Sequence, residues 1–245
     1  MKKLLVFDLD GTLCPLGKGL LAEDIARLKE LEQAGYGISI CSGKTTFYLS
    51  GLTRQLELEY PYLVGENGAT YQFGPELPPE RYYEYPVSKE AKAQIRRMRD
   101  MIDDELEGKI WYQPNTVVLT PFPKQPETFE VIQKMIDDNL DNLSELIIYR
   151  HVDCFDFIPN NINKYNGVKY LAELLEITAD DMIAFGNGAN DIPMFEFAGT
   201  TVGIGEEFMQ GHAQGTVAGD TNSYKQDYCF ETIGEALDAV GKLFG

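Results

Sequence analysis

The segment VFDLDGTLC, residues 6–14, places two aspartates at the end of an apolar run. The run at residues 3–9 predicts a buried strand, so Asp8 and Asp10 fall where that strand ends. In an open parallel sheet, ligands bind in the crevice beyond the carboxyl ends of the strands. Two close carboxylates repel each other unless a cation or a shared proton compensates them. The segment therefore predicts either a Mg²⁺ site, because that ion prefers oxygen ligands, or an ordinary pair of capping aspartates.

The elements after this strand indicate the fold around it. Residues 22–34 carry apolar side chains at helical spacing and end at Gly35, and residues 36–41 form a second apolar run. A strand, helix, strand order with apolar strands is typical of a parallel sheet covered on both faces. The same alternation returns late in the chain, with helices expected at residues 166–175 and 191–198 and strands at 182–185 and 201–204.

The middle of the chain follows a different pattern, which begins near the proline-rich loop at residues 74–79. Short strands are expected at residues 82–85, 109–112, 117–120, 145–149 and 154–158, and amphipathic helices at 89–106 and 127–139. We therefore predict an α/β core with a Rossmann-like parallel sheet at residues 1–73 and 160–245. An inserted α+β cap domain at residues 74–159 interrupts it.

Composition limits the class of protein. The chain has 245 residues, of which 44% are hydrophobic, and a formal net charge of −18. This length gives room for one substantial core and a small second domain. The negative charge disfavours nucleic acid and anionic membranes as partners. Since no run of about 18 apolar residues is present and the basic start leads into a strand-length segment, a cytoplasmic protein is expected.

The cysteines give no sign of a metal or disulfide framework. Cys14, Cys41, Cys154 and Cys229 lie far apart in the sequence, and no two of them have CxxC spacing. We expect them to be buried small hydrophobic residues rather than a zinc site or a disulfide framework.

Three further segments carry groups suited to phosphate and metal. In CSGKT, Ser42 and the backbone of Gly43 stand at a strand-to-helix turn, a good position for phosphate, although serine is also an ordinary helix cap. In NINKYNG, Lys164 precedes a helix and can neutralise an anion, although a lone lysine is usually a solvated charge. The glycine-rich turn in AFGNGANDIPM holds Asn187, Asn190 and Asp191.

These motifs, in this order, resemble those of the haloacid dehalogenase-like phosphatases. They are most similar to the Cof-type branch of sugar-phosphate phosphatases, which carries a C2-type α+β cap between the second and third motifs. DLDGT at residues 8–12, CSG at 41–43, Lys164 and GNGANDIPM at 186–194 match the four motifs of the family. The segment ENGA at residues 66–69 matches as well, and the resemblance covers nearly the whole chain.

The resemblance implies a covalent mechanism. Asp8 is the implied nucleophile, which forms an aspartyl-phosphate that water then hydrolyses. Asp10 is the implied general acid for the departing oxygen and the base for the water. Lys164 is the third implied catalytic residue, because its charge holds the transferring phosphoryl group.

The resemblance also implies the binding residues. The implied ligands of Mg²⁺ are Asp8, Asp10, Asn187 and Asp191, with Asp10 able to use its backbone carbonyl. The implied phosphate and substrate contacts are Thr12, Ser42, Gly43, Asn67 and Asn190. Hydrogen bonds and charge at such positions supply most of the help that phosphoryl transfer needs.

The chain departs from the family pattern at two of these positions. Asn187 stands where relatives commonly have a metal-binding aspartate, so we expect weaker Mg²⁺ binding rather than its loss, because an amide oxygen still ligates a hard cation. Lys44 stands where many relatives have arginine, which replaces a bidentate donor by a point charge.

The expected function is that of a Mg²⁺-dependent phosphatase for small phosphate esters, with sugar phosphates as the expected substrates. A phosphomutase of the same fold and a weakly active or non-catalytic metabolite-binding relative are the alternatives. The insert offers aromatic and basic side chains that could contact a ligand, although sheet packing is the more common role of such aromatics. These residues are Tyr82, Tyr83, Tyr85, Trp111, Tyr112, Tyr149, Arg150 and His151.

Overall fold

The computed structural model describes residues 1–205 and 226–244. The chain divides into two compact units, a core formed by Met1–Tyr83 with Asn163–Gly245 and an insert formed by Glu84–Ile162. The insert thus begins later in the sequence than the proline-rich loop suggests. The reason is that a strand after this loop, β5 (Arg81–Glu84), joins the edge of the core sheet.

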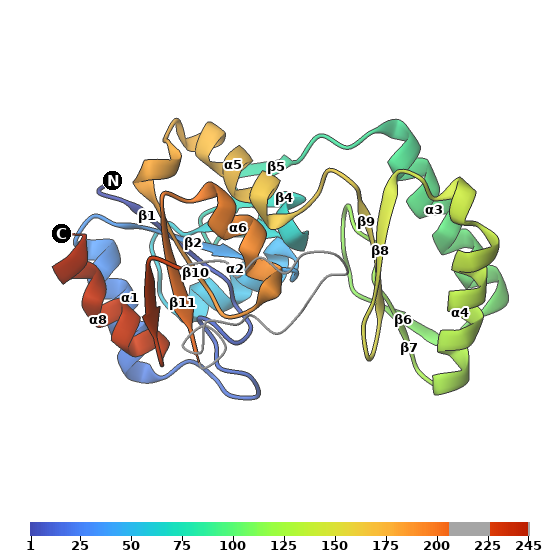
Figure 1. Ribbon diagram of the computed structural model, residues 1–245, viewed down its shortest axis with the longest axis horizontal. Coiled ribbons are helices and arrows are strands. Elements are labelled where there is room, and N and C mark those ends of the chain that lie inside the picture. Colours follow the sequence, from blue (N-terminus) through green and yellow to red (C-terminus); the bar gives the residue numbers. More distant parts are fainter. Residues whose placement is uncertain (206–225, 245) are drawn as a thin grey trace. The chain divides into compact units, whose positions relative to one another are not determined.

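The core is built on an eight-stranded sheet with the strand order β12-β11-β10-β1-β2-β3-β4-β5 (Figure 1). The remaining strands are β1 (Leu4–Phe7), β2 (Gly37–Cys41), β3 (Tyr62–Gly65), β4 (Thr70–Phe73), β10 (Met182–Gly186), β11 (Thr200–Ile204) and β12 (Tyr228–Phe230). Strands β12 to β3 pair in parallel, and β4 runs antiparallel to β3. Consequently, β1 lies inside the sheet, between β10 and β2.

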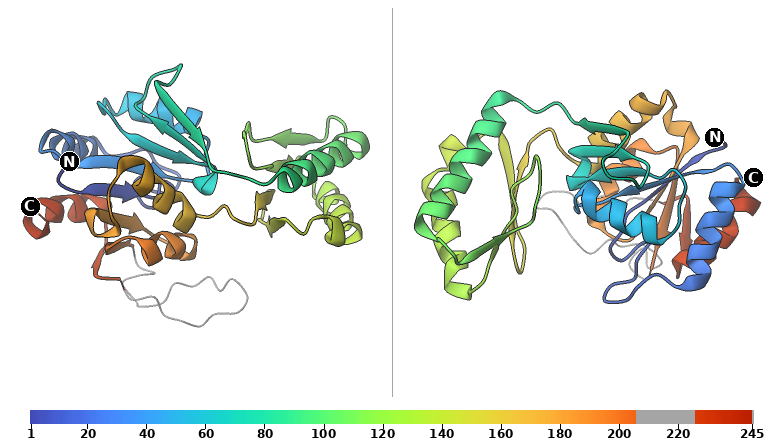
Figure 2. Two further views of the ribbon diagram at one scale, coloured as in Figure 1. Left: turned by 90° about the horizontal axis from the view of Figure 1, so that it is seen from above. Right: turned by 180° about the vertical axis from the view of Figure 1, so that it is seen from behind.

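Helices cover both faces of this sheet (Figure 2). One face carries α1 (Ala22–Gln33), α2 (Thr46–Gln55) and α8 (Ile233–Leu243), and the other carries α5 (Lys164–Leu175) and α6 (Ile192–Phe197). Leu5 and Phe7 of β1 are fully buried and share one apolar cluster with Leu28 of α1, Leu49 of α2 and Leu237 of α8. Short 3₁₀ turns lie at η1 (Glu66–Gly68), η2 (Leu140–Asn142), η3 (Ala179–Asp181) and η4 (Ala189–Asp191).

The insert has its own apolar core. Helices α3 (Lys89–Glu105) and α4 (Pro126–Asp138) pack on one face of two antiparallel pairs (Figure 1). These pairs are β6 (Ile110–Tyr112) with β7 (Pro121–Pro123), and β8 (Leu146–Arg150) with β9 (Phe155–Pro159). Met98, Ile102, Ile132 and Phe157 are buried between the layers. No helix in the parts of the chain that the structure describes has the length and apolarity needed to span a membrane.

The strand expected at residues 117–120 does not form. Only Leu119 bridges to Phe157, through backbone hydrogen bonds of 3.2 and 2.9 Å. The preceding loop is held by side chains instead, because Asn115 Nδ2 donates to Thr120 Oγ1 at 2.9 Å. Local side-chain bonds of this kind compete with strand pairing. The regular ladder therefore starts only at Pro121.

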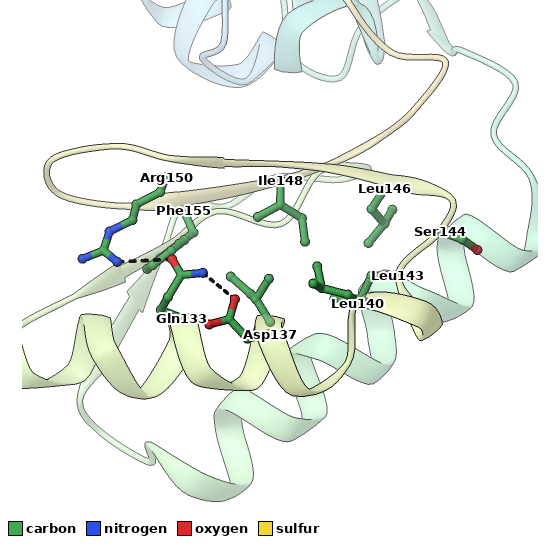
Figure 3. A pocket seen from close by; sticks show the side chains of 10 residues that line it. Gln133, Asp137, Leu140, Leu143, Ser144, Leu146, Ile148, Arg150 and Phe155 are labelled. Atoms are coloured by element: carbon green, nitrogen blue, oxygen red, sulfur yellow. Dashed lines mark hydrogen bonds between the residues drawn. The ribbon is translucent and has the colours of Figure 1, made fainter. Parts of the chain in front are cut away.

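The β8 strand sends alternate side chains toward α4. Ile148 and Arg150 point to the helix side, where Gln133 donates to Asp137 Oδ1 at 3.0 Å and accepts from Arg150 at 3.2 Å (Figure 3). A hollow lies between these side chains and is lined largely by leucine and isoleucine. The residues between them in the sequence, such as Tyr149, belong to the opposite face because side chains alternate along a strand.

Two of the aromatic residues considered as ligand contacts pack within the insert. Trp111 lies against Phe122 with ring centroids 5.1 Å apart, and the hydroxyl of Tyr112 donates to Asp103 at 2.7 Å. Tyr83 belongs to the core instead, where its ring lies 5.6 Å from that of Phe73.

Candidate active site

Three neighbouring strands end at the same edge of the core sheet. Phe7, the last residue of β1, is paired with Ile40 of β2 and Phe185 of β10. The residues that follow these strands, among them Asp8 and Asn187, therefore gather at one place. All the candidate site residues belong to the core unit.

A buried ion cluster occupies this edge. Lys164 Nζ lies 2.5 Å from Asp8 Oδ1 and 2.7 Å from Asp191 Oδ1. Asp8 and Lys164 are each 4% exposed, and Asp191 is fully buried. Lys164 is the first residue of α5, where the side chain of Asn163 caps the helix by accepting from the backbone of Asn166 at 2.9 Å. Two carboxylates thus share one ammonium group.

Backbone groups hold the second oxygen of Asp191. Its Oδ2 accepts hydrogen bonds from the N–H groups of Asn187 at 2.9 Å and Gly188 at 3.2 Å. The glycine at the end of β10 makes room for this carboxylate, since a Cβ on Gly186 would lie 2.5 Å from the Cβ of Asp191. The glycine-rich turn therefore holds Asp191 with two N–H groups, and Gly186 leaves space for its side chain.

The ion cluster shifts the pKa of its members. Burial alone would lower the pKa of Lys164, but the carboxylates of Asp191 and Asp8 raise it well above its usual range, so it remains an ammonium group. Burial raises the pKa of Asp8, the Lys164 charge opposes this rise, and Asp191 adds to it. The cluster keeps one uncompensated negative charge when both carboxyls are ionised, and a cation would remove that imbalance.

The other oxygen of Asp8 is bound by Thr12. The buried hydroxyl of Thr12 lies 3.1 Å from Asp8 Oδ2 and 3.0 Å from Asn187 Oδ1. Since a hydroxyl carries a single proton, it can donate to only one of these acceptors at a time. Thr12 therefore links the first and last motifs directly.

Gly11 allows this close approach. Its φ of +90° lies in the left-handed region, and a Cβ there would lie 2.3 Å from Asn187 Nδ2. We expect Gly11→Ala to cost about 1–3 kcal/mol of unfolding free energy from backbone strain, and to lose further stability because the new Cβ displaces the Asn187 side chain. Urea denaturation measures both terms together.

Gly17→Ala is the matched control for this prediction. Gly17 also has a positive φ, +70°, but no atom lies within 4 Å of its added Cβ. This variant should lose only the part that comes from backbone strain. Equal losses in the two variants would contradict the proposed contact between position 11 and Asn187.

Asp10 differs from Asp8 in its surroundings. Its side chain is half exposed, and its Oδ2 lies 3.3 Å from Lys44 Nζ. Asp10 can therefore reach a solvent-borne ligand, while Asp8 is held in the buried cluster. This ion pair also places Lys44, which follows CSG where many relatives have arginine, beside the first motif.

The CSGK and ENGA segments are tied together by backbone hydrogen bonds. The N–H of Asn67 donates to the carbonyl of Ser42 at 2.9 Å, and that of Glu66 donates to the carbonyl of Lys44 at 2.9 Å. Asn67 has a left-handed φ of 58°. Its side chain lies next to Gly43, whose added Cβ would lie 3.4 Å from it. Ser42, Gly43 and Asn67 therefore lie next to one another.

Two residues near the cluster have surroundings that the sequence did not indicate. Burial raises the pKa of Cys41 to about 12, an effect that Lys164 opposes and that Asp8 and Asp191 strengthen, so Cys41 is a neutral thiol. Tyr71 donates to the carbonyls of Gly68 at 2.7 Å and Gly167 at 3.2 Å, and so joins η1 to α5. Nothing in the sequence indicated that a buried tyrosine in a short strand would join these two elements.

The cysteines agree only in part with their expected burial. Cys41 and Cys154 are buried, but Cys14 and Cys229 are only partly buried. The expectation was wrong for these two because Cys14 donates to the carbonyl of Lys18 at 3.2 Å in an exposed loop and Cys229 lies on the short strand β12.

Asn190 is exposed on η4, directly before Asp191.

Comparison with known proteins places this chain in a class of hydrolases. A haloacid dehalogenase-like hydrolase from Bacteroides thetaiotaomicron shares the fold with a TM-score of 0.72 at 18% identity, over 97% of this chain and 99% of that one. The family model of the haloacid dehalogenase-like hydrolases matches residues 5–207. The chain therefore belongs to this family, and the expected family and α/β fold class are confirmed.

Two curated relatives are phosphatases. The chain is 25% identical over 205 residues to a phosphoglycolate phosphatase of Methanopyrus kandleri, covering 82% of this chain and 84% of the relative. It is 22% identical over 253 residues to a 5-amino-6-(5-phospho-D-ribitylamino)uracil phosphatase of Bacillus subtilis, covering 82% and 87%.

Proposed function

We propose that this hydrolase is a Mg²⁺-dependent phosphatase for small phosphorylated metabolites, with sugar phosphates as its substrates. The buried cluster of Asp8, Lys164 and Asp191 carries the proposal, because it presents a fixed carboxylate at a ligand-binding edge of a parallel sheet. The names of the two relatives, both phosphatases of small phosphate esters, support it.

The proposed first step is attack by a carboxylate oxygen of Asp8 on the substrate phosphorus. The new bond makes an aspartyl-phosphate, and the bond from phosphorus to the ester oxygen breaks. Lys164 favours the ionised form of Asp8 and holds it in position through the 2.5 Å contact. Thr12, Ser42 and the backbone of Gly43 are the proposed donors to the phosphoryl oxygens, where preorganised hydrogen bonds are most effective.

Asp10 is the proposed proton carrier. A protonated Asp10 gives its proton to the departing ester oxygen, which leaves as an alcohol. The resulting carboxylate then takes a proton from the water that attacks the aspartyl-phosphate, which releases phosphate and restores Asp8. The exposure of the Asp10 side chain supports this role, because the group must meet both a substrate and a water molecule.

The donor set at the sheet edge fits Mg²⁺. The carboxylates of Asp8 and Asp191, the amide oxygen of Asn187 and the backbone carbonyl of Asp10 would hold the ion, and all of these are hard oxygen donors. The uncompensated negative charge of the buried cluster supports the same assignment. When bound, the ion would neutralise phosphoryl oxygens and reduce repulsion between them and Asp8.

A direct test measures phosphate release from a panel of sugar phosphates, polyol phosphates and phosphoglycolate. We expect turnover with Mg²⁺ and its loss with a chelator. Release of inorganic phosphate supports a phosphatase, whereas an isomerised phosphate ester without phosphate release would indicate a phosphomutase. Absence of both products with every ester, at saturating Mg²⁺, would contradict the proposal.

Asn187 offers a second test. We expect Asn187→Asp to lower the half-saturating Mg²⁺ concentration at least about threefold, because a charge adds Coulomb attraction to the ion. Without metal the variant should melt below the parent, since a third carboxylate then lies near Asp8 and Asp191. The carboxylate can still accept the hydrogen bond that Thr12 offers at 3.0 Å. Thermal melting and phosphatase rate across a Mg²⁺ titration measure both effects.

Gln33→Glu serves as the charge control for this titration. It adds one negative charge at the exposed end of α1, near the opposite edge of the sheet, where Gly35 accepts from the backbone of Lys2. Its Mg²⁺ dependence should equal that of the parent. If Asn187→Asp also left the half-saturating concentration unchanged, Asn187 would lie outside the metal shell.

A further inference from the structure

A group of metal-ligating side chains lies at the tip of the β8–β9 hairpin in the insert. His151, Cys154 and Asp156 each offer one ligand atom, and these atoms all lie within 4.8 Å of one another. We propose that the cluster binds a divalent transition-metal ion of the zinc class. The cluster belongs to the insert, whereas the oxygen-lined site belongs to the core unit, and the proposal does not depend on the function proposed for the core.

The hairpin brings the three side chains to one face. The N–H of His151 donates to the carbonyl of Cys154 at 2.9 Å, so these two residues face each other across the turn. Opposed residues of a hairpin hold their Cβ atoms about 4.5–5.5 Å apart. Asp156 shares the face of Cys154 because side chains alternate along a strand. The pair between them, Arg150 and Phe155, points toward α4 instead (Figure 3).

A hydrogen-bonded chain fixes Asp156. Its Oδ2 lies 3.0 Å from Nε2 of His151, and its Oδ1 accepts from Thr120 Oγ1 at 2.6 Å. Asn115 Nδ2 in turn donates to Thr120 Oγ1 at 2.9 Å. Outer hydrogen bonds of this kind orient the ligands of metal sites. Thr120 thereby holds Oδ1 of Asp156, and Oδ2 lies on the side of His151.

The residues of the cluster differ in solvent exposure. Cys154 and Thr120 are buried, whereas about half of the His151 side chain is exposed. An ion would thus meet the imidazole first and reach the thiol from outside, so the site has an entry path. A fourth position on the solvent side would be filled by water, as in three-ligand zinc sites.

The ligand set favours zinc over the ion proposed for the core. Zinc binds sulfur, nitrogen and oxygen at about 2.0–2.3 Å, which in a tetrahedral site separates ligand atoms by roughly 3.3–3.8 Å. The three ligand atoms lie within 4.8 Å of one another, so a modest rotation of their side chains would bring them into this range. A thiolate and an imidazole are poor ligands for Mg²⁺ and good ones for Zn²⁺ or Co²⁺. A thiolate and a carboxylate together also match the charge of the ion.

The test titrates Co²⁺ into the full chain after treatment with a chelator, in saturating Mg²⁺ so that oxygen-ligand sites are occupied. A cobalt–thiolate bond gives a charge-transfer band in the near ultraviolet, which reports the cysteine directly. We expect the band to saturate at one Co²⁺ per chain and to disappear on addition of Zn²⁺. Cys154→Ser should abolish it, and His151→Gln and Thr120→Val should each raise the half-saturating Co²⁺ concentration at least about tenfold.

Cys229→Ser is the matched control, because Cys229 is a partly buried thiol of the core and its loss should leave the band unchanged. His151→Gln keeps the test decisive if Cys154→Ser fails to fold, since His151 is exposed and outside the apolar core. A parent protein without a cobalt–thiolate band would overturn the proposal. So would a band that survives Cys154→Ser, that disappears in Cys229→Ser, or that saturates equally in His151→Gln.

Discussion

Asp8→Asn will lower the rate of phosphate release by about 10⁴-fold or more, the scale seen when an enzyme loses a covalent nucleophile. An amide cannot accept the phosphoryl group to form the acyl phosphate of the proposed first step. The fold should survive, because asparagine nearly matches the shape of aspartate and Lys164 keeps its 2.7 Å contact with Asp191. Burial also disfavours the charge of Asp8, so its removal spares the protein a desolvation cost.

Asp24→Asn gives the same chemical change at another buried carboxylate. Asp24 lies on α1, and its Oδ1 is 2.9 Å from Arg27. This variant should lose some stability and keep its turnover. Steady-state kinetics and thermal melting of both variants form the experiment. Activity near the parent's level in Asp8→Asn would remove Asp8 as the nucleophile.

Lys164→Met is expected to have the largest effect on stability. It removes the ammonium shared by Asp8 and Asp191 and leaves two buried carboxylates without a counter-charge. Breaking a buried pair in this way typically costs about 3–5 kcal/mol of unfolding free energy. Turnover should also fall sharply, because the proposed nucleophile loses the group that positions it. Urea denaturation in a chelating buffer measures the stability change.

Lys29→Met is the control for losing a lysine in an ion pair. Lys29 is paired with Glu57 on the surface of the core, where the Glu57 side chain is exposed and that of Lys29 partly exposed. Exposed pairs contribute about 0–1 kcal/mol, so this variant should melt close to the parent.

Mg²⁺ should stabilise Lys164→Met more than the parent, since a cation would then replace the missing charge. Similar unfolding free energies for the two lysine variants would show that Lys164 does not neutralise the cluster.

The sequence predicted the core of the site because parallel strands make its geometry regular. Asp8 directly follows the apolar strand β1, and Asp191 lies in the turn after the apolar strand β10. The carboxyl ends of neighbouring parallel strands meet at one edge of the sheet. The pattern alone was therefore enough to group residues far apart in the chain. It could not show that Lys164 lies between the two carboxylates, since that contact depends on how α5 packs.

Edge strands and loops were less predictable. The strand β5 has the expected position but belongs to the core sheet, because a half-exposed segment carries no pattern that tells which sheet it will join. No residue range was predicted for β3 or α2, although CSGKT was assigned to a strand-to-helix turn, and the terminal α8 was not predicted. Thr45 and Thr232 cap α2 and α8 by accepting from backbone N–H groups. The pair of Lys44 and Asp10 is a tertiary contact without a sequence signal.

The place of β1 between β2 and β10 has a consequence for the order in which the molecule is made. Asp8 and Lys164 are separated by 156 positions in the chain, and the strand that completes the sheet beside β1 emerges from the ribosome after the whole insert. Until then β1 is an open sheet edge, and Asp8 at its end lacks its counter-charge. Closing so long a loop costs entropy that only the finished contacts repay. Both β10 and Lys164 are therefore synthesised only after the insert. A nascent chain that ends before them has an unpaired edge at β1 and an incomplete site.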